Sequence, residues 1–265
     1  MTPESFPGTS RPALRAVLLG ASNLAIALPA IIERLRRAAD GPVEVLAACG
    51  HGRSYGEWSR YLWFRELPGI AGCGLWGDLA ARPPLPTVAL LTDIGNDLAY
   101  GEPAARIASW IGACLELLSA ARAETVLTLL PTARLLALPA WQFHLARTVF
   151  FPGRQAERRD VFDRLRQLDP RLRRLGEQAG AHLVEPDSAW YGIDPIHFRR
   201  RKAREAWDRI LAPWPLDCRG LNGERFRRLV RRPPGRPEEL RLAGLTRRHE
   251  QPSGHFADGT TIALY

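Results

Sequence analysis

The 265-residue chain is poor in cysteine, and the cysteines that it has lie far apart. The wide spacing excludes the close cysteine pairs of zinc sites and redox motifs. A chain of this length can bury a core large enough to fold without disulfides. We therefore expect free thiols and a reducing, cytoplasmic location. The four cysteines are Cys49, Cys73, Cys114 and Cys218.

Long hydrophobic runs are also absent, so no segment predicts a membrane span. The nearest approach is "AVLLGASNLAIALPAII", residues 16–32, which follows Arg11 and Arg15 and shares some features with a signal peptide. Gly20 and Pro29 interrupt this run, and an amphipathic segment follows it directly. The pattern favours a cytoplasmic protein, with a secreted protein as the alternative.

Lysine is nearly missing. Lys202 is the only lysine among 37 lysine and arginine residues, and the formal net charge is +9. A basic surface is compatible with nucleic acid, anionic lipid or an acidic substrate as a partner. The cations are spread over several segments, however, and no basic motif interleaved with aromatic residues occurs. We favour a coding bias toward arginine and expect no specific nucleic-acid partner.

Five short apolar runs predict β-strands. The runs are nearly continuous rather than alternating, which is typical of strands buried on both faces of a parallel sheet. Amphipathic helical patterns lie between them, and the first of these has Pro29 placed as its first helical residue. Strands that alternate with helices predict an α/β fold with three layers, α/β/α, around a five-stranded parallel sheet. The runs are residues 16–20, 43–49, 87–95, 124–131 and 181–186.

Two segments fall outside this alternation. Residues 132–160 form an insertion with several aromatic residues, among them Trp141 and Phe150, which we expect to be a lid or a pocket wall. From residue 217 the chain is rich in Arg, Pro and Gly, and a turn signal, "ADGT", precedes its last apolar stretch. We predict one domain over residues 1–216 and a basic extension over residues 217–265 that packs on it.

Polar residues follow four of the predicted strands, at the sheet edge where parallel sheets bind ligands. Ser22 follows the first strand, Gly52 the second and Asn96 the third, while Asp194 and His197 follow the fifth. Taken singly, residues of these types are usually helix caps or turns. The Asp-Pro dipeptide disfavours helical backbone at Asp194, so a compact turn lets its carboxylate reach the imidazole of His197.

Together these residues meet the demands of nucleophilic catalysis. A serine hydroxyl needs an adjacent base, and that base needs a carboxylate to orient it; Ser22, His197 and Asp194 are residues of these types. The oxyanion that forms needs preorganised donors. We predict these donors to be the backbone N–H groups of Ser22 and Gly52 and the side-chain amide of Asn96. Chemistry of this kind requires no metal and no organic cofactor.

The four segments resemble the four sequence blocks of the SGNH (GDSL-type) hydrolase superfamily. "GASNL" is similar to the first block, "AACGHGRSYG" to the second, "TDIGNDLAYG" to the third and "GIDPIH" to the last. The likeness covers residues 14–214 and implies a flavodoxin-like sheet. It assigns Ser22 as the nucleophile, Gly52, or else Gly50, and Asn96 as oxyanion donors, and Asp194 and His197 as its partners.

One departure from the family pattern stands next to the nucleophile, because Ala21 occupies a position where the family usually has Asp. The family does not use that acid in its triad, so the departure bears on how Ser22 is positioned. We also predict substrate contacts from side chains near the blocks and in the insertion, with packing of the second block as the alternative for two of them, His51 and Arg53. The candidates are Asn23, His51, Arg53 and Trp141.

The resemblance implies a serine esterase that hydrolyses a small-molecule carboxylic ester through an acyl-enzyme. Two alternatives stay open: an acyltransferase with the same triad, and a non-catalytic binding module on a degenerate hydrolase fold. The G-x-S-x-G elbow of α/β-hydrolases is excluded, because Leu24 occupies its last position. The sequence does not predict the oligomeric state.

Overall fold

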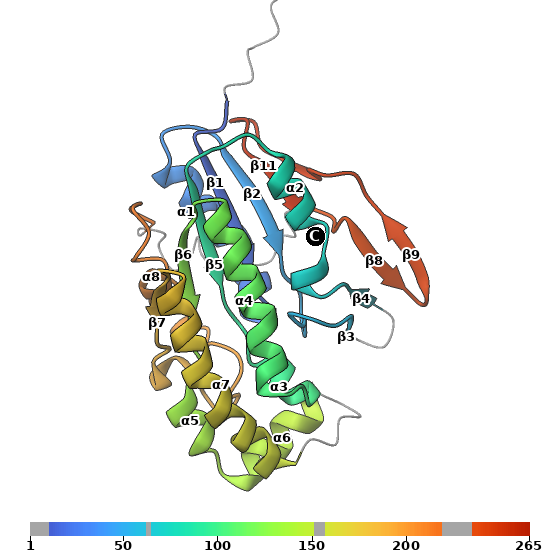
Figure 1. The fold of residues 1–265 in the computed structure, drawn as a ribbon, viewed down its shortest axis with the longest axis vertical. Helices are drawn as coiled ribbons and strands as arrows, with labels where there is room; N and C mark the ends of the chain where they lie inside the picture. Colours follow the sequence, from blue (N-terminus) through green and yellow to red (C-terminus); the bar gives the residue numbers. More distant parts are fainter. Residues whose placement is uncertain (1–10, 62–64, 151–156, 219–234) are drawn as a thin grey trace, which may run out of the picture.

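The computed structural model of the protein describes residues 11–61, 65–150, 157–218 and 235–265 (Figure 1). All five predicted strands form, and they pair in parallel in the order β2-β1-β5-β6-β7. This is the strand order 2-1-3-4-5 of flavodoxin-like, doubly wound sheets, so the predicted fold class is confirmed. The strands are β1 (Leu14–Leu19), β2 (Val43–Ala48), β5 (Thr87–Leu91), β6 (Glu124–Thr128) and β7 (His182–Val184).

The sheet is wider than the five strands predicted from the sequence, and that number was wrong. Strand β11 (Thr261–Leu264) pairs in parallel with β2, and β10 (Gly254–His255) pairs antiparallel with β11, which makes seven strands. Both added strands come from the C-terminal extension. Strand β11 covers backbone N–H and C=O groups of β2 that would otherwise lie at an open sheet edge.

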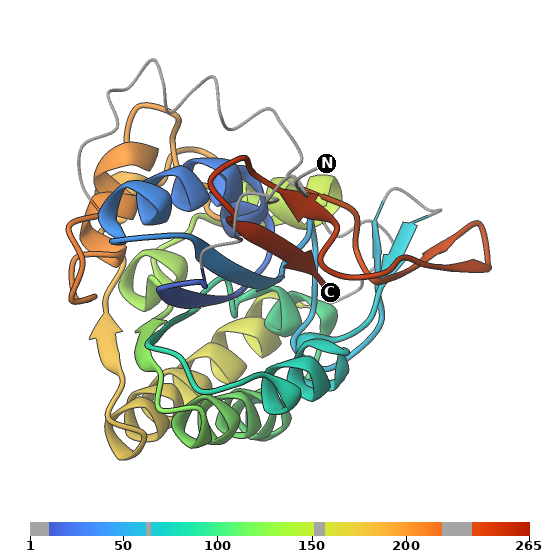
Figure 2. The ribbon, with the colours of Figure 1, turned by 90° about the horizontal axis from the view of Figure 1, so that it is seen from above.

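Helices cover both faces of the sheet, as Figure 2 shows. On one face α1 (Ser22–Ala38) and α8 (Ala203–Ile210) pack in an apolar cluster with alternate residues of the strands, such as Leu18 and Val45. On the other face lie α2 (Leu75–Ala81), α4 (Ala104–Ala120) and α7 (Arg158–Gln178), packed on the residues between, such as Leu19. These two cores explain why most residues on both sides of the strands are apolar.

The first helix begins earlier than predicted. It starts at Ser22, directly after β1, and Pro29 lies inside it rather than at its first position. The chain therefore turns from strand to helix within Gly20 and Ala21. A Cβ atom at Gly20 would lie 2.7 Å from Cγ2 of Thr92, so this tight turn requires glycine.

The predicted insertion lies beyond the carboxyl ends of the strands (Figure 1). Its described part forms α5 (Thr132–Leu136) and α6 (Ala140–Phe150). The short helix α3 (Asn96–Tyr100) follows β5 at the same end of the sheet. This arrangement places the insertion beside the loops in which the candidate site residues lie.

A second, antiparallel sheet projects beside the main one, in the order β3-β4-β8-β9 (Figure 1). Its strands β3 (Ser59–Tyr61) and β4 (Arg65–Leu67) follow the second sequence block, whereas β8 (Glu239–Leu242) and β9 (Leu245–Arg248) belong to the extension. The described part of the extension thus adds strands to both sheets, while the division at residue 217 stays a prediction. Two 3₁₀ helices, Ile70–Gly72 and Ser188–Trp190, complete the described elements.

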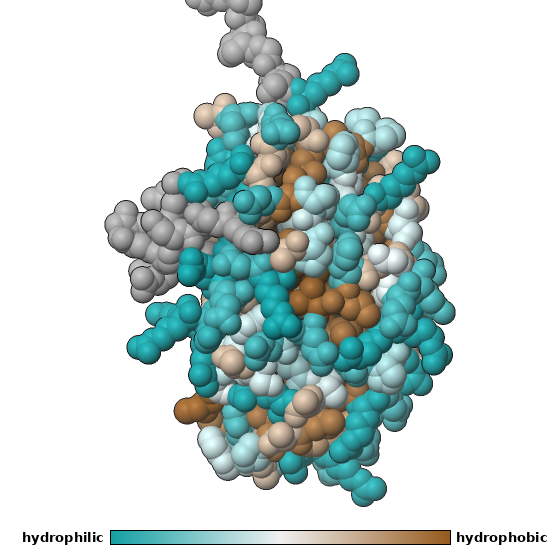
Figure 3. All heavy atoms as spheres, turned by 90° about the vertical axis from the view of Figure 1, so that its left-hand side faces the viewer, coloured by the Kyte–Doolittle hydropathy of each residue, from teal (hydrophilic) through white to brown (hydrophobic). Residues whose placement is uncertain are grey.

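The surface is mostly hydrophilic on the face that Figure 3 shows, with small apolar patches between polar side chains. Among the described helices, none combines the length and the hydrophobicity that crossing a membrane requires. The four cysteines are unpaired, as predicted. In the described parts of the chain, no three His, Cys, Asp or Glu side chains are grouped so that they could hold a metal ion.

Candidate active site

The predicted nucleophile, Ser22, is the first residue of α1 and is 5% exposed. The carboxylate of Asp93, which follows β5, caps this end of the helix. Its Oδ2 accepts hydrogen bonds from the backbone N–H of Ala21 at 3.0 Å and of Leu24 at 3.1 Å. Helix N-termini favour negative charge, because their first N–H groups have no partner within the helix. Asp93 thereby fixes the turn that presents Ser22.

The predicted acid–base pair forms within one compact turn. Oδ2 of Asp194 lies 2.7 Å from Nδ1 of His197, and Oδ1 accepts the backbone N–H groups of Ile196 at 2.8 Å and His197 at 3.1 Å. Burial acts to raise the pKa of Asp194, but these hydrogen bonds outweigh it and the pKa is lowered. An ionised carboxylate at Nδ1 favours the tautomer in which Nε2 is free to accept a proton.

Backbone contacts join the two ends of the loop that contains Asp194 and His197, and side chains of the insertion bind this loop. Tyr191 and Phe198 form an antiparallel bridge, and the backbone N–H of Arg199 donates to the carbonyl of Trp190 at 2.7 Å. From the insertion, Nε2 of Gln142 donates to the carbonyl of Ile193 at 2.6 Å. Arg134 of α5 donates to the neighbouring carbonyl of Gly192 in the same loop. The insertion therefore supports the loop that carries the predicted base.

Asn23 joins this loop to α1, the helix that begins with the predicted nucleophile. Its Nδ2 donates to the carbonyl of Ile196 at 3.0 Å, and its Oδ1 accepts the backbone N–H of Phe198 at 3.0 Å. These two groups flank His197, and Asn23 is the neighbour of Ser22 in the chain. Among the described residues, no hydrogen bond links the Ser22 hydroxyl to the His197 ring; in many enzymes such a contact tightens only with substrate bound.

The predicted side-chain oxyanion donor, Asn96, is the first residue of α3. It is buried, and its Nδ2 donates to the carbonyl of Arg53 at 3.3 Å. Gly52 has a backbone φ of +65°, in the left-handed region, and its carbonyl accepts a hydrogen bond from the Tyr100 hydroxyl. A Cβ atom at Gly52 would lie 2.9 Å from that hydroxyl oxygen, so the position requires glycine.

A buried carboxylate, Asp97, holds the loop that contains Gly52. It accepts hydrogen bonds from the hydroxyl of Ser54 and, at 2.9 Å, from the backbone N–H of Tyr55. Burial raises the pKa of Asp97 to about 6, although these two hydrogen bonds act against the rise. The Gly52 loop is thus tied to the start of α3 through a group that titrates in the mildly acidic range.

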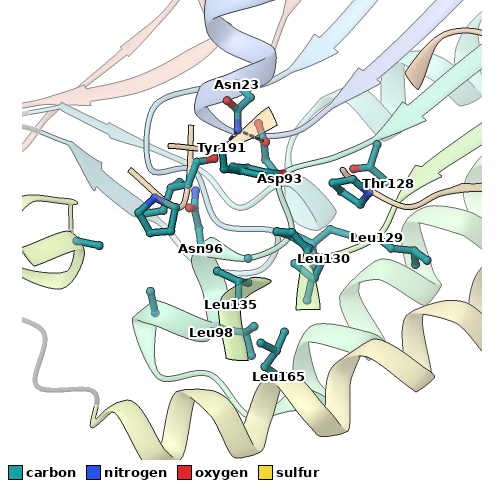
Figure 4. Close-up of a pocket in the computed structure, with 18 of the residues that line it drawn as sticks. Asn23, Asp93, Asn96, Leu98, Thr128, Leu129, Leu130, Leu135, Leu165 and Tyr191 are labelled. Atoms are coloured by element: carbon teal, nitrogen blue, oxygen red, sulfur yellow. Dashed lines mark hydrogen bonds between the residues drawn. The ribbon is translucent and has the colours of Figure 1, made fainter. Parts of the chain in front are cut away.

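A cavity of about 150 Å³ opens at this edge of the sheet. Figure 4 shows Asn23, Asp93 and Asn96 at one end of the cavity and leucine side chains at the other. Ser22 also lines this cavity. The apolar end is lined by Leu98, Leu130, Leu135, Phe143, Phe162 and Leu165.

The other predicted substrate contacts lie in different environments. Arg53 is fully buried, with Nε donating to the carbonyl of Pro68 at 3.0 Å and Nη1 to the carbonyl of Tyr265, which favours the packing alternative. His51 is half-buried, and burial followed by the nearby charge of His197 lowers its pKa. Trp141 of α6 is 59% exposed and outside the cavity wall. Asp93, whose carboxylate binds the start of α1, was not among the site residues predicted from the sequence.

Comparison with known proteins gives similarity only among solved structures, since no family model and no curated protein matches the chain. The psychrotrophic esterase EstA from Pseudoalteromonas sp. is 15% identical, with 75% of this chain and 95% of that chain covered and a TM-score of 0.46. An aryl esterase of M. smegmatis is 15% identical, with 81% and 99% covered and a TM-score of 0.47. AlinE4, an SGNH-hydrolase family esterase, is 17% identical, with 66% and 77% covered and a TM-score of 0.38. All three are esterases by name.

Proposed function

We propose that the protein is a serine esterase that hydrolyses a carboxylic ester through an acyl-enzyme. The observation that carries this proposal is the Asp194–His197 pair, in which a carboxylate oxygen and a ring nitrogen lie 2.7 Å apart. The loop of this pair is hydrogen-bonded to Asn23, the residue next to Ser22 in the chain. Ser22 and Asn96 both belong to the wall of the same cavity. A nucleophile, a base with an oriented tautomer and an amide donor are the groups that acyl transfer requires.

In the first half-reaction, Oγ of Ser22 attacks the ester carbonyl carbon while Nε2 of His197 takes the hydroxyl proton. The carbonyl oxygen becomes an oxyanion, which accepts hydrogen bonds from the N–H groups of Ser22 and Gly52 and from Nδ2 of Asn96. The C–O bond to the leaving alcohol then breaks, and the alcohol leaves with the proton from His197. Asp194 stabilises the imidazolium that exists between these two transfers.

In the second half-reaction, water attacks the acyl-enzyme carbonyl carbon and gives a proton to His197. The bond between the acyl carbon and Oγ of Ser22 breaks, Ser22 regains its proton, and the carboxylic acid leaves. Entry of another alcohol in place of water would give transfer instead of hydrolysis. Product analysis with added methanol separates the two reactions.

The cavity supports an apolar acyl group of limited size as the substrate class. Its volume of about 150 Å³ is close to that of apolar protein cavities that bind a benzene-sized molecule. We expect p-nitrophenyl butanoate and hexanoate to be hydrolysed with higher kcat/KM than the acetate, which leaves the apolar walls uncovered, and than the dodecanoate, which exceeds them. A rate that is highest for the acetate would contradict this assignment of the cavity.

The decisive test of the mechanism is Ser22→Ala, with Ser109→Ala as the matched control because Ser109 is exposed on α4. We expect Ser22→Ala to abolish hydrolysis of p-nitrophenyl butanoate and labelling by a fluorophosphonate, with an unchanged melting temperature. Ser109→Ala should retain both. Normal turnover by Ser22→Ala would exclude Ser22 as the nucleophile.

A further inference from the structure

Two side chains that the proposed reaction does not use, Asp93 and Asn23, connect the three segments of the site. Asp93 follows β5, Asn23 is in the first turn of α1, and the loop that holds His197 follows β7. We propose that Asp93 and Asn23 are positioning residues that hold His197 in register with Ser22, and that Asp93 provides the side-chain cap of α1 that Ala21 cannot. This inference rests on the proposed function.

The Asp93 carboxylate is saturated with hydrogen bonds from one helix end. Oδ2 binds the N–H groups of Ala21 and Leu24, and Oδ1 accepts Nδ2 of Asn23 at 2.9 Å. Burial raises the pKa of Asp93, while the hydrogen bonds from Asn23 and from these N–H groups act against the rise. The site therefore surrounds this carboxylate with three hydrogen-bond donors, which offset part of the cost of its burial.

The backbone of Asp93 has a φ of +60°, which is unusual for a residue with a side chain. A left-handed conformation costs about 1–2 kcal/mol in a residue other than glycine, so it persists only where the surroundings determine it. Glycine at position 93 would relieve that cost but would remove the carboxylate that binds Ala21, Asn23 and Leu24. Three hydrogen bonds that only the Asp93 side chain can make therefore offset the cost of its left-handed backbone.

The Asn23 side chain uses both of its amide donors and its carbonyl. Its Nδ2 donates to Asp93 and to the carbonyl of Ile196, while its Oδ1 accepts the N–H of Phe198. Figure 4 shows Asn23 and Asp93 facing one another at the polar end of the cavity. Aspartate has no donors and leucine has no polar atoms, so neither can replace asparagine in this set.

These contacts form one continuous path to the base. Asp93 orients the amide of Asn23, Asn23 binds the peptide groups on both sides of His197, and Asp194 binds the His197 ring at 2.7 Å. The same Asp93 holds the backbone on both sides of Ser22, at Ala21 and Leu24. Displacements of about 1 Å between reacting groups can lower turnover about 100-fold.

The first test is Asn23→Ala, with Asp40→Asn as a control at an exposed position. We expect Asn23→Ala to lower kcat for p-nitrophenyl butanoate about 100-fold with KM within about threefold, because substrate binding is kept while the base is displaced. Placed in the His197→Ala background, Asn23→Ala should not lower the residual kcat further. A similar further loss in that background, or a kcat within threefold of wild type, would overturn the proposal.

The second test exchanges the partners and does not depend on whether Asn23→Ala folds. In wild type the Asn23 amide nitrogen and an Asp93 carboxylate oxygen are 2.9 Å apart, and Asn23→Asp alone replaces that amide by a second carboxylate. Because two carboxylates at this distance repel one another, we expect a kcat at least 100-fold below wild type. Adding Asp93→Asn restores a donor and an acceptor between positions 23 and 93, so kcat should recover at least tenfold over Asn23→Asp. It should stay below wild type, because a carboxylate at position 23 still cannot donate to the carbonyl of Ile196. Failure of the double variant to exceed Asn23→Asp overturns the proposal.

These outcomes are separable from failure of the proposed function. If Ser22→Ala remained active, the esterase mechanism itself would fall. If Ser22→Ala were inactive while Asn23→Ala and Asn23→Asp both matched wild type, the esterase mechanism would stand and only the positioning role would be excluded.

Discussion

Asp93, which is half-buried, and Asp97, which is fully buried, are carboxylates four residues apart that bind opposite sides of the site. Asp93 binds the start of α1 and, through Asn23, the loop of His197; we call this the nucleophile side. Asp97 binds Ser54 and Tyr55 in the loop that follows Gly52; we call this the oxyanion side. Burial raises the pKa of both groups.

The difference lies in how far apart in the chain the partners are. On the nucleophile side, the contacts of Asp93 and Asn23 span separations of 69 to 175 residues. On the oxyanion side, both partners of Asp97 belong to one loop, 42 and 43 residues away. Loss of a contact on the nucleophile side is therefore expected to misalign the proposed nucleophile and the proposed base, whereas loss on the oxyanion side should increase the mobility of one loop only.

The largest expected effect is on the nucleophile side, from Asp194→Asn. An amide at position 194 no longer favours the tautomer that leaves Nε2 as an acceptor, so kcat should fall about 10⁴-fold. Steady-state kinetics with p-nitrophenyl butanoate measure this loss, and Asp40→Asn again provides the exposed control. A loss smaller than tenfold would mean that Asp194 does not orient His197.

The next effect is on the oxyanion side, from Asn96→Ala. In the proposed mechanism the amide of Asn96 donates mainly when negative charge develops, so kcat should fall about 100- to 1000-fold while KM changes far less. Measuring kcat and KM separately checks this. An unchanged kcat would remove Asn96 from the oxyanion role and leave that side without a side-chain donor.

Gly52→Ala tests how strongly the oxyanion side depends on a glycine, through the stability of the folded protein. The new Cβ would lie 2.9 Å from the Tyr100 hydroxyl oxygen on a backbone with φ of +65°, so we expect a loss of about 2 kcal/mol in the free energy of unfolding. Urea denaturation measures it. Gly72→Ala is the matched control, because a Cβ there meets nothing within 4 Å. Equal stability of the two variants would show that the Gly52 turn is not strained by a side chain.

The smallest effect concerns the titration of Asp97. Its pKa in the folded protein is about 6, against an ordinary 3.8, so the folded state binds more protons between these values. The contribution of Asp97 to stability therefore falls as pH rises through this window and is level above it. Relative to Asp97→Asn, wild type should lose about 1 kcal/mol between pH 5 and 7. A difference in unfolding free energy that does not change with pH would contradict the raised pKa.

Much of the architecture could be predicted from local patterns. The continuous apolar runs predicted β1, β2, β5, β6 and β7, because strands covered on both faces have no polar side. The start of α1 was not predictable in this way. Its N–H groups at positions 21 and 24 are satisfied by Asp93, some 70 residues away, while local preference favoured Pro29 as the first helical residue. Strands β10 and β11 were missed as part of the sheet because two- and four-residue segments carry little periodic signal.

The sequence by itself determined the doubly wound fold and the residue types at the strand ends, since both depend on patterns within short segments. It also determined the Asp194–His197 pair, because a three-residue separation and an Asp-Pro turn are local features. Only the tertiary structure decided that Asn23 binds the His197 loop, that Arg53 is buried, and that Asp93 caps α1. The physical reason is that buried polar groups must find partners in three dimensions, and those partners lie in segments that the chain order keeps apart.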